Sequence, residues 1–339
     1  MRKSLYEALK RNCKLHHANS SLSDLFQLFN RFSYSKGINY DSKNNLLYCL
    51  SAKTGTTNWK TMAAAVRRNI TISEMMKIKD SPDVNIYKDT PSLYRLTTEL
   101  DFESENFHKN MKPVHGIISV RHPLIRLYSA WAHRLSDSLA YHRGFFYKQI
   151  RYIKQNFGDE NMEKPEGIFV SLSGFFKFVA TRVAHESLKD VHWWRIHKRC
   201  HICDHIDLYN AVVNTETAEY DSAEFLKNIN KAWIGSFPEA YDKKEIEEFG
   251  INVKGRSRGP VQQTKDVKKH EEEIKKYIRE NVETEVIENI YRRFCLDFKL
   301  FEYGLEGFVK GETDVESEDC RSDEELERVI VDVTIEPEE

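Results

Sequence analysis

Four residues in one short segment have side chains or backbones suited to binding an anion: Lys53, Gly55, Thr56 and Thr57. They lie in "SAKTGTTNWK" (residues 51–60), between an apolar run and a predicted helix. Gly55 lets the backbone approach a ligand closely, and the two threonines add hydroxyl donors. The amides from Lys53 to Asn58 can converge at the helix N-terminus, where the helix dipole favours negative charge. The segment therefore predicts an anion-binding loop.

The order of residues in this loop argues against a nucleoside triphosphatase. The GxxxxGK[ST] pattern of those enzymes is missing. Lys53 precedes the glycine, whereas the lysine of that pattern follows it. A glycine-threonine turn before a helix is also common, so the loop alone leaves the ligand open.

A second candidate anion contact is Arg121, which directly follows the predicted strand 113–120. An arginine at the carboxyl end of a strand points into the crevice where open α/β sheets bind ligands. Ser129 lies eight residues further along, two turns into a predicted helix that begins near Pro123, and could reach the same anion. The alternative is an arginine that caps a sheet edge beside an ordinary amphipathic helix.

Apolar runs and helical spacing predict the elements that must position these residues. The expected strands are 45–51, 113–120 and 205–213. The expected helices are one or two within 1–35, then 58–69, a helix from Pro123, one within 167–183, 221–233, and a long amphipathic helix over 268–301 that is continuous or broken once. Strands that alternate with helices favour an α/β fold with a mainly parallel sheet.

The charge of the chain is distributed unevenly. The whole sequence carries 51 Lys and Arg against 53 Asp and Glu. From Glu312 to Glu339, 13 acidic residues stand against two arginines, which leaves 49 basic and 40 acidic residues in 1–311. A basic body attracts anionic ligands such as phosphates, sulfated glycans or nucleic acid, with ordinary solvated surface charge as an equal alternative. The acidic tail is expected to be disordered.

The sequence contains no segment that is expected to enter a membrane. It has no stretch of about 18 apolar residues, and its first residues lack the apolar region of a signal peptide. These features alone predict a soluble chain that is not exported. Six cysteines in 339 residues are too few for a disulfide scaffold, and their redox state stays open.

Taken together, the two anion segments resemble the carbohydrate sulfotransferases of the chondroitin and dermatan 4-O-sulfotransferase type. "SAKTGTTNWK" is similar to the first family motif, with Ala52 where the family usually has proline, and "SVRHPLIRLYSAW" is similar to the second. Three further blocks follow in the family's order: "VHWWRIHKRCHIC", "IDLYNAVVNTET" and "IYRRFCLDFKLFEYG". The resemblance covers residues 45–304.

This resemblance implies a P-loop-like sulfotransferase fold, in which helices flank a central, mainly parallel sheet. The domain organisation that follows has three parts. They are a helical segment at 1–44, a sulfotransferase domain at 45–311 and the acidic tail at 312–339.

The resemblance also implies that the anion is 3′-phosphoadenosine 5′-phosphosulfate (PAPS), a consumed co-substrate. Arg121 and Ser129 would hold its 3′-phosphate, since a guanidinium suits a tetrahedral oxyanion. Lys53 would stabilise the charge that develops on the bridging oxygen as the sulfuryl group leaves, so no metal is expected. The residues that would hold the 5′-phosphosulfate are Lys53, Thr54, Gly55, Thr56, Thr57 and Asn58.

The acceptor hydroxyl needs a base, and histidine suits this role near neutral pH. His192, in "DVHWW", matches the family block and is the first candidate. Asp190, His115 and His133 are rivals, and a lone histidine is more often structural.

Two further features have competing interpretations. "KGRSRG" (254–259) is a basic glycine loop, and related glycan sulfotransferases close such a loop over the nucleotide, so Arg256 could contact PAPS or an anionic sugar. A solvated basic turn is the equal alternative.

The cysteines and histidines within 192–205 suggest zinc, but no second CxxC or HxxxH pair is evident. The resemblance instead implies cysteines that form disulfides in the Golgi lumen.

The expected function is therefore PAPS-dependent transfer of a sulfuryl group to a hydroxyl of a glycan. The expected partner is an anionic glycan or proteoglycan, not nucleic acid, and the oligomeric state is open. The alternatives are an inactive relative that binds PAPS or glycan, and a soluble sulfotransferase for a small alcohol. The resemblance implies the Golgi lumen or membrane, whereas the lack of an apolar anchor leaves a soluble cytoplasmic location open.

Overall fold

The computed structural model describes residues 3–16, 38–41, 46–56, 59–60, 64, 72–78, 115–136, 146–157, 163–164, 167–168, 170–203, 206, 209–217, 221 and 267–310. The chain divides into two compact units, Met1–Arg121 with Ile196–Gly255, and His122–Arg195 with Arg256–Glu339. The elements of the first unit are α1 (Lys3–His16), β1 (Ile38–Asp41), β2 (Leu46–Leu50), α4 (Ile72–Ile78), β3 (His115–Val120), α11 (Ile196–Cys200), β6 (Ala211–Asn214) and the 3₁₀ helix η3 (Thr215–Thr217). Those of the second are α7 (Pro123–Arg134), α9 (Tyr147–Phe157), β4 (Glu163–Lys164), β5 (Gly167–Ile168), α10 (Leu172–Ala180), α14 (Val267–Asn281) and α15 (Thr284–Leu300).

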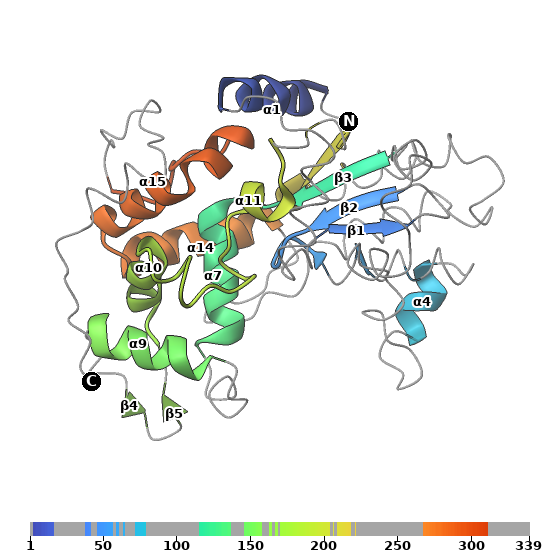
Figure 1. Cartoon of the computed structure of the whole chain (residues 1–339). Coiled ribbons are helices and arrows are strands. Elements are labelled where there is room, and N and C mark those ends of the chain that lie inside the picture. Colours follow the sequence, from blue (N-terminus) through green and yellow to red (C-terminus); the bar gives the residue numbers. More distant parts are fainter. Residues whose placement is uncertain are drawn as a thin grey trace. The chain divides into compact units, whose positions relative to one another are not determined.

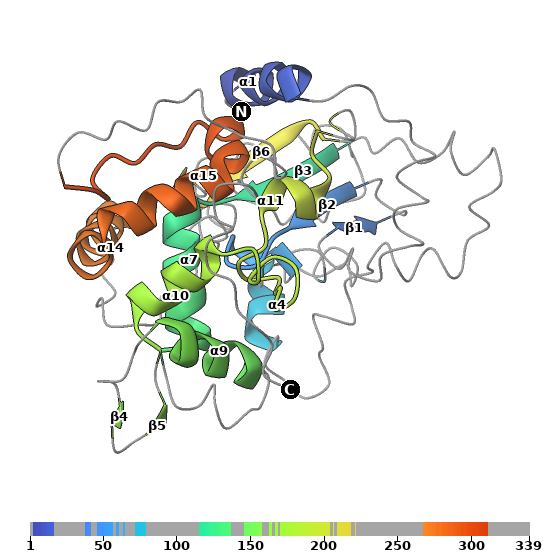
Figure 2. The same cartoon turned by 60° about the vertical axis from the view of Figure 1, so that its left-hand side comes forward.

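The first unit contains a four-stranded sheet in the order β1-β2-β3-β6. Strands β2, β3 and β6 run parallel, whereas β1 pairs antiparallel with β2 at the edge. Figure 2 shows these four strands side by side. The predicted α/β fold with a mainly parallel sheet is confirmed. Because the parallel strands share one direction, their carboxyl ends lie at the same edge, where α/β sheets bind ligands.

The parallel strands are short apolar runs, as expected for strands that are buried on both faces. The predicted strands 45–51 and 113–120 correspond to β2 and β3, but β6 is shorter than the predicted 205–213. Just before β6, Oδ1 of the Asn210 side chain accepts a hydrogen bond from the Gly116 backbone amide at 3.0 Å. The backbone amide of Asn210 donates to the Gly116 carbonyl at 2.9 Å. A side-chain amide thus replaces one backbone contact of the ladder, and regular pairing begins only at Ala211.

Two disulfides cross-link the first unit. Cys49, on β2, is bonded to Cys200 at the end of α11. Cys13, on α1, is bonded to Cys203. Four of the six cysteines whose redox state the sequence left open are therefore oxidised, and α1 and α11 are covalently joined to other parts of the same unit.

The second unit is helical. Figure 1 shows α7 among α9, α10, α14 and α15, and contacts join α10 to α9 and α15 and α7 to α14. Pro123 occupies the first turn of α7, as predicted, and His122 caps this helix by accepting the Leu124 amide on Nδ1 at 3.2 Å. The apolar core of this unit includes Trp131 and Phe175 and continues along the buried face of α15.

Two predicted helices of this unit differ in detail from the structure. The region 167–183 begins with β5, and its helix spans only Leu172–Ala180 because Ser171 caps it, accepting the Gly174 amide at 2.9 Å. The long C-terminal helix is broken once into α14 and α15, where Glu283 adopts an extended backbone with φ −66° and ψ 141°.

Several predicted features lie outside the described residues and stay predictions. They include a second helix near the N-terminus, the acidic tail and the domain boundaries at 44/45 and 311/312. Of the predicted helix 58–69, residues 59, 60 and 64 are described and are helical, and of 221–233 only Asp221 is described. Among the described helices, none is long and apolar enough to cross a membrane.

Candidate functional site

The loop after β2 is organised around one carbonyl. The hydroxyls of Thr54 and Thr56 both donate to the Ser51 carbonyl, at 2.7 and 2.6 Å. Ser119, on β3, donates to the Thr54 carbonyl at 2.6 Å. Thr54, Ser51 and Ser119 are fully buried, so these bonds fix the loop to the two strands. The Thr56 hydroxyl, which the sequence predicts as a ligand contact, donates within the loop in this structure.

Two residues of this loop have left-handed backbones. Lys53 has φ 70° and Gly55 has φ 77°. A positive φ is uncommon for a residue other than glycine, and such residues concentrate at functional sites. Left-handed residues are also a feature of the backbone nests that bind anions. A helix follows at once, since the Trp59 amide donates to the Gly55 carbonyl at 3.2 Å. The loop therefore has the geometry of an anion-binding turn at a helix start.

Arg121 lies beside this loop, at the carboxyl end of β3. One of its terminal nitrogens donates to the Lys53 carbonyl at 3.4 Å. Its side chain is 9% exposed, and its Nε has no hydrogen-bond partner among the described residues. A buried guanidinium beside a left-handed loop, at the carboxyl end of a parallel strand, is an arrangement suited to an anionic ligand.

Lys60 and Arg199 add positive charge to the same unit. Burial lowers the pKa of Lys60, and the charge of Arg199 lowers this pKa further. Two neighbouring cations disfavour each other's charged state, and an anion placed near them relieves that repulsion. The unit that contains the loop is thus suited to anionic ligands.

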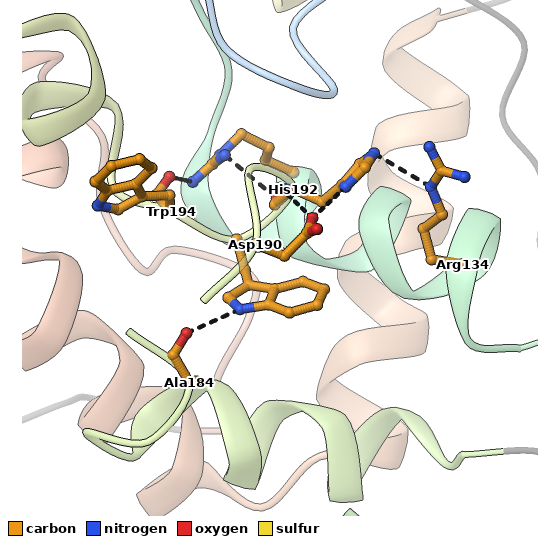
Figure 3. Close-up of polar contacts among 7 residues, drawn as sticks. Arg134, Ala184, Asp190, His192 and Trp194 are labelled. Atoms are coloured by element: carbon orange, nitrogen blue, oxygen red, sulfur yellow. Dashed lines mark hydrogen bonds and ion pairs between the residues drawn. The ribbon is translucent and has the colours of Figure 1, made fainter. Parts of the chain in front are cut away.

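In the second unit, the His192 ring lies between the Asp190 carboxylate and the Arg134 guanidinium, as Figure 3 shows. Oδ1 of Asp190 accepts hydrogen bonds from the His192 amide, at 2.9 Å, and from Nδ1 of the ring. Nε of Arg134 lies 3.2 Å from Nε2 of the same ring. An ionised carboxylate only accepts and a guanidinium only donates, so Nδ1 carries the proton and Nε2 carries the lone pair. This tautomer is the one required of a general base.

The Asp190 carboxylate is kept ionised by its neighbours. Burial alone would raise the pKa of Asp190, but the hydrogen bonds and charge of His192, with the charge of Arg134, outweigh burial and lower this pKa. A carboxylate on Nδ1 orients the ring and stabilises the imidazolium that forms when Nε2 takes a proton. Asp190, a rival candidate for the base, is therefore placed as a partner of His192.

Two buried side chains hold the segment that carries His192. Arg126, on α7, is fully buried and donates to the carbonyls of His192, at 3.3 Å, and Trp194, at 2.6 Å. Trp193 is also fully buried, and its indole nitrogen donates to the Ala184 carbonyl at 3.0 Å (Figure 3). The candidate base is thus on a segment with little freedom to move.

Sequence reasoning assigned no role to Arg126 or Arg134. The available signal for Arg126 was its place among apolar neighbours, since residues 124–128 of α7 are all buried. A charged residue inside such a run needs buried acceptors. No comparable sequence signal marks Arg134.

The remaining candidate residues are distributed over both units. His115 begins β3, beside Leu46 and at the opposite end of the strand from Arg121, so it is poorly placed for that anion site. Burial lowers the pKa of His115. The His133 ring centroid is 6.5 Å from that of His192, and Ser129 is partly buried on the same helix α7.

The structure brings the predicted residues together in two groups. Lys53, Thr54, Gly55 and Thr56 lie with Arg121 in the first unit, whereas Ser129 and His192 belong to the second. The other three predicted residues lie outside the described part of the chain: Thr57, Asn58 and Arg256.

The zinc interpretation of residues 192–205 is not supported by their chemistry. Cys200 and Cys203 are each in a disulfide, so neither sulfur is available as a thiolate ligand. Among the described residues, no group of three or more His, Cys, Asp or Glu side chains is arranged to hold a metal.

Comparison with known proteins points to a single protein family. The sequence model of the sulfotransferase family matches residues 36–304. The chain is 24% identical to rat (Rattus norvegicus) carbohydrate sulfotransferase 11 over 80% of this chain and 68% of the relative. It is 20% identical to Danio rerio carbohydrate sulfotransferase 10, over 79% and 66% of the two chains, and 24% identical to human (Homo sapiens) carbohydrate sulfotransferase 9, over 78% and 52%. No solved structure matches the chain significantly.

Proposed function

Because the chain belongs to the sulfotransferase family, we propose that it transfers a sulfuryl group from PAPS to a hydroxyl of a glycan. The observation that carries this proposal is the buried guanidinium of Arg121 beside the left-handed loop of Lys53. The names of the relatives, all carbohydrate sulfotransferases, support a glycan as the acceptor. A chondroitin-like or related anionic polymer is the acceptor class that we propose.

The residues present fit the two anionic ends of PAPS. Arg121, with a buried Nε that lacks a partner among the described residues, would hold the 3′-phosphate, for which the resemblance also implies Ser129. Lys53 and the amides of Gly55 and Thr56 would hold the 5′-phosphosulfate at the start of the helix. The same arrangement, an anion loop between a parallel strand and a helix, supports a P-loop-like sulfotransferase fold.

In the proposed reaction the acceptor oxygen forms a bond to sulfur while the bond from sulfur to the 5′-phosphate oxygen breaks. PAPS supplies this activated sulfuryl group and leaves as 3′-phosphoadenosine 5′-phosphate. Lys53 would stabilise the charge that develops on the leaving oxygen, which is a transition-state interaction. Nε2 of His192 would take the proton of the acceptor hydroxyl, and Asp190 would stabilise the resulting imidazolium.

We also propose that the chain resides in an oxidising secretory compartment, the Golgi lumen or membrane. The support is the pair of disulfides, Cys13–Cys203 and Cys49–Cys200, because such bonds persist in secretory compartments and are rare in the cytosol. Cys295, on α15, is disulfide-bonded as well.

The test is binding of 3′-phosphoadenosine 5′-phosphate, measured by calorimetry. Replacing Arg121 by glutamine should weaken binding about 10- to 150-fold, because a hydrogen-bonded charged contact contributes about 1.5–3 kcal/mol. Arg11→Gln is the matched control, since Arg11 is an exposed arginine of the same unit, and it should bind like the wild type. Absence of binding by folded wild-type protein would overturn the proposal. Binding without transfer to any desulfated glycan would instead identify an inactive nucleotide-binding relative.

A further inference from the structure

The nitrogen of His192 that must accept a proton is already in contact with a cation. Nε of Arg134 donates to Nε2 at 3.2 Å, while the other ring nitrogen is bonded to Asp190. A hydroxyl cannot give its proton to a lone pair that another N–H occupies. The guanidinium also disfavours the imidazolium by like-charge repulsion. In this arrangement His192 is therefore blocked as a base, both by geometry and by charge.

Arg134 is not the residue that fixes the His192 ring. It is the last residue of α7, and its guanidinium carbon lies 5.5 Å from the centroid of the Phe146 ring, a contact that a ligand would have to replace. The His192 ring is held independently, by Asp190 on Nδ1 and through its own backbone carbonyl by Arg126. A movement of the Arg134 side chain would thus expose Nε2 and leave the ring in place.

An anionic group is the ligand that would draw Arg134 away. A guanidinium pairs with a carboxylate or a sulfate through two parallel hydrogen bonds, which are stronger than one bond to a neutral imidazole. The same pairing neutralises the charge that opposes protonation of His192. Both effects follow when the acceptor carries an anion near the hydroxyl to be modified.

We propose that Arg134 is a removable cap on the base, released by a carboxylate or sulfate group of the acceptor. This inference rests on the proposed function and adds a specificity determinant to it: acceptors that carry an anion next to the reacting hydroxyl uncap His192, and neutral acceptors do not. Arg134 is a positioning residue in this scheme, because it acts through His192. Among the described residues, Asp190, Arg134 and His133 have titratable or charged side chains beside the ring, and Arg126 contacts the backbone.

The first measurement compares transfer to desulfated chondroitin and to the same polymer with its carboxyl groups reduced. The wild type should prefer the anionic polymer in kcat by about tenfold or more, as expected for loss of a charged hydrogen-bonded pair. In Arg134→Met this ratio should approach one, because the cap is absent for both polymers. Arg151→Met, which replaces an exposed arginine of α9, should keep the wild-type ratio. Equal rates on the two polymers for the wild type would overturn the anion response, whereas transfer to neither would count against the proposed acceptor class.

A second measurement needs no turnover. Diethyl pyrocarbonate modifies unprotonated imidazole nitrogens, and the rate at His192 can be followed by peptide mass spectrometry. Arg134→Met should raise this rate several-fold relative to the wild type and to Arg151→Met. An unchanged rate would refute the cap even in a protein that binds the nucleotide normally. Absence of nucleotide binding by the wild type would instead count against the proposed function. Failure of the cap and failure of the proposed function are therefore distinguishable.

Discussion

Lys53 combines an unfavourable backbone with the charge that the proposed reaction needs. Its φ of 70° lies in the left-handed region, which costs about 1–2 kcal/mol for a residue with a Cβ. The loop bonds from Thr54 and Ser119 maintain this conformation. Strain of this kind persists where function requires it. Replacement of Lys53 should therefore have separate effects on stability and on turnover.

We expect Lys53→Gly to raise the free energy of unfolding by about 1 kcal/mol, because glycine adopts this backbone without strain. Lys53→Ala keeps a Cβ and should leave stability nearly unchanged. Both variants should lose about 10²–10³-fold in turnover of PAPS, as when one transition-state donor is removed. Urea unfolding and a sulfuryl-transfer assay measure the two effects. Full activity of the alanine variant would show that the ammonium has no role in transfer.

At the residue scale, sequence patterns are informative where the residues of a group are local in the chain. The Lys53 loop and Arg121 each follow an apolar strand directly, so both could be assigned to the same edge of a parallel sheet. The contact between Arg134 and His192 joins residues 58 positions apart. Only the packing of α7 against the segment around Trp193 creates it, and no spacing rule describes that packing.

At the scale of the elements, the exposed carboxylate of Glu283 links α10 and α15 by hydrogen bonds, in addition to their apolar packing. Glu283, at the start of α15, accepts from Lys177 at 2.7 Å and from Ser173 at 2.6 Å, both on α10. Partial burial would raise the pKa of Glu283, but these hydrogen bonds outweigh it and lower the pKa from 4.5 to about 2. Since the folded pKa is depressed, the stabilisation is complete above pH 4.5 and is lost as the pH falls towards 2.

Replacing Glu283 by glutamine should lower the free energy of unfolding by about 0.5–1 kcal/mol at neutral pH, a magnitude limited by solvent screening. The difference from the wild type should shrink as the pH is lowered from about 5 to about 3. Glu280→Gln is the control, because Oε1 of Glu280 lies 3.8 Å from Nζ of Lys276 within the same helix, and no described contact links Glu280 to another helix. Denaturant titrations at each pH provide the measurement. A difference that does not depend on pH would rule out the carboxylate as the cause.

Element boundaries were less predictable than element types. The strand-helix alternation and the helix from Pro123 follow from apolar periodicity, and the structure contains both. The late start of β6 follows from the Asn210 side chain, and the early end of α10 from the Thr181 backbone, which is extended at φ −81° and ψ 160°. Apolar patterns do not report such side-chain substitutions or local backbone changes.

For the whole molecule, the resemblance over 45–304 agrees with the family match over 36–304. The pairing of the cysteines was not predictable, because six cysteines allow 15 connectivities. The two described disulfides close chain segments of 190 and 151 residues. Cross-links over such long segments stabilise a fold mainly by restricting the unfolded chain.

We expect the double replacement Cys49→Ala with Cys200→Ala to lower the free energy of unfolding by about 2–5 kcal/mol. Both cysteines are fully buried, so a reducing agent should act slowly on the native wild type and quickly on the urea-unfolded protein. Cys13→Ala with Cys203→Ala is the matched comparison for the other bond. Urea unfolding with and without reductant measures both. An unfolding free energy that does not respond to the removal of either bond would contradict the proposed role of these bonds in stability.

The placement of Cys200 and Cys203 also has a consequence for the order of events during synthesis. Their partners, Cys49 and Cys13, are made 151 and 190 residues earlier, which corresponds to roughly 10–40 seconds of translation. During that interval Cys13 and Cys49 have each other as oxidation partners, and neither native bond can form. A nascent chain that pairs them early must later exchange that bond through attack by a thiolate of the 200–203 segment. Recovery of the native protein should therefore depend on a disulfide isomerase more than on the rate of oxidation.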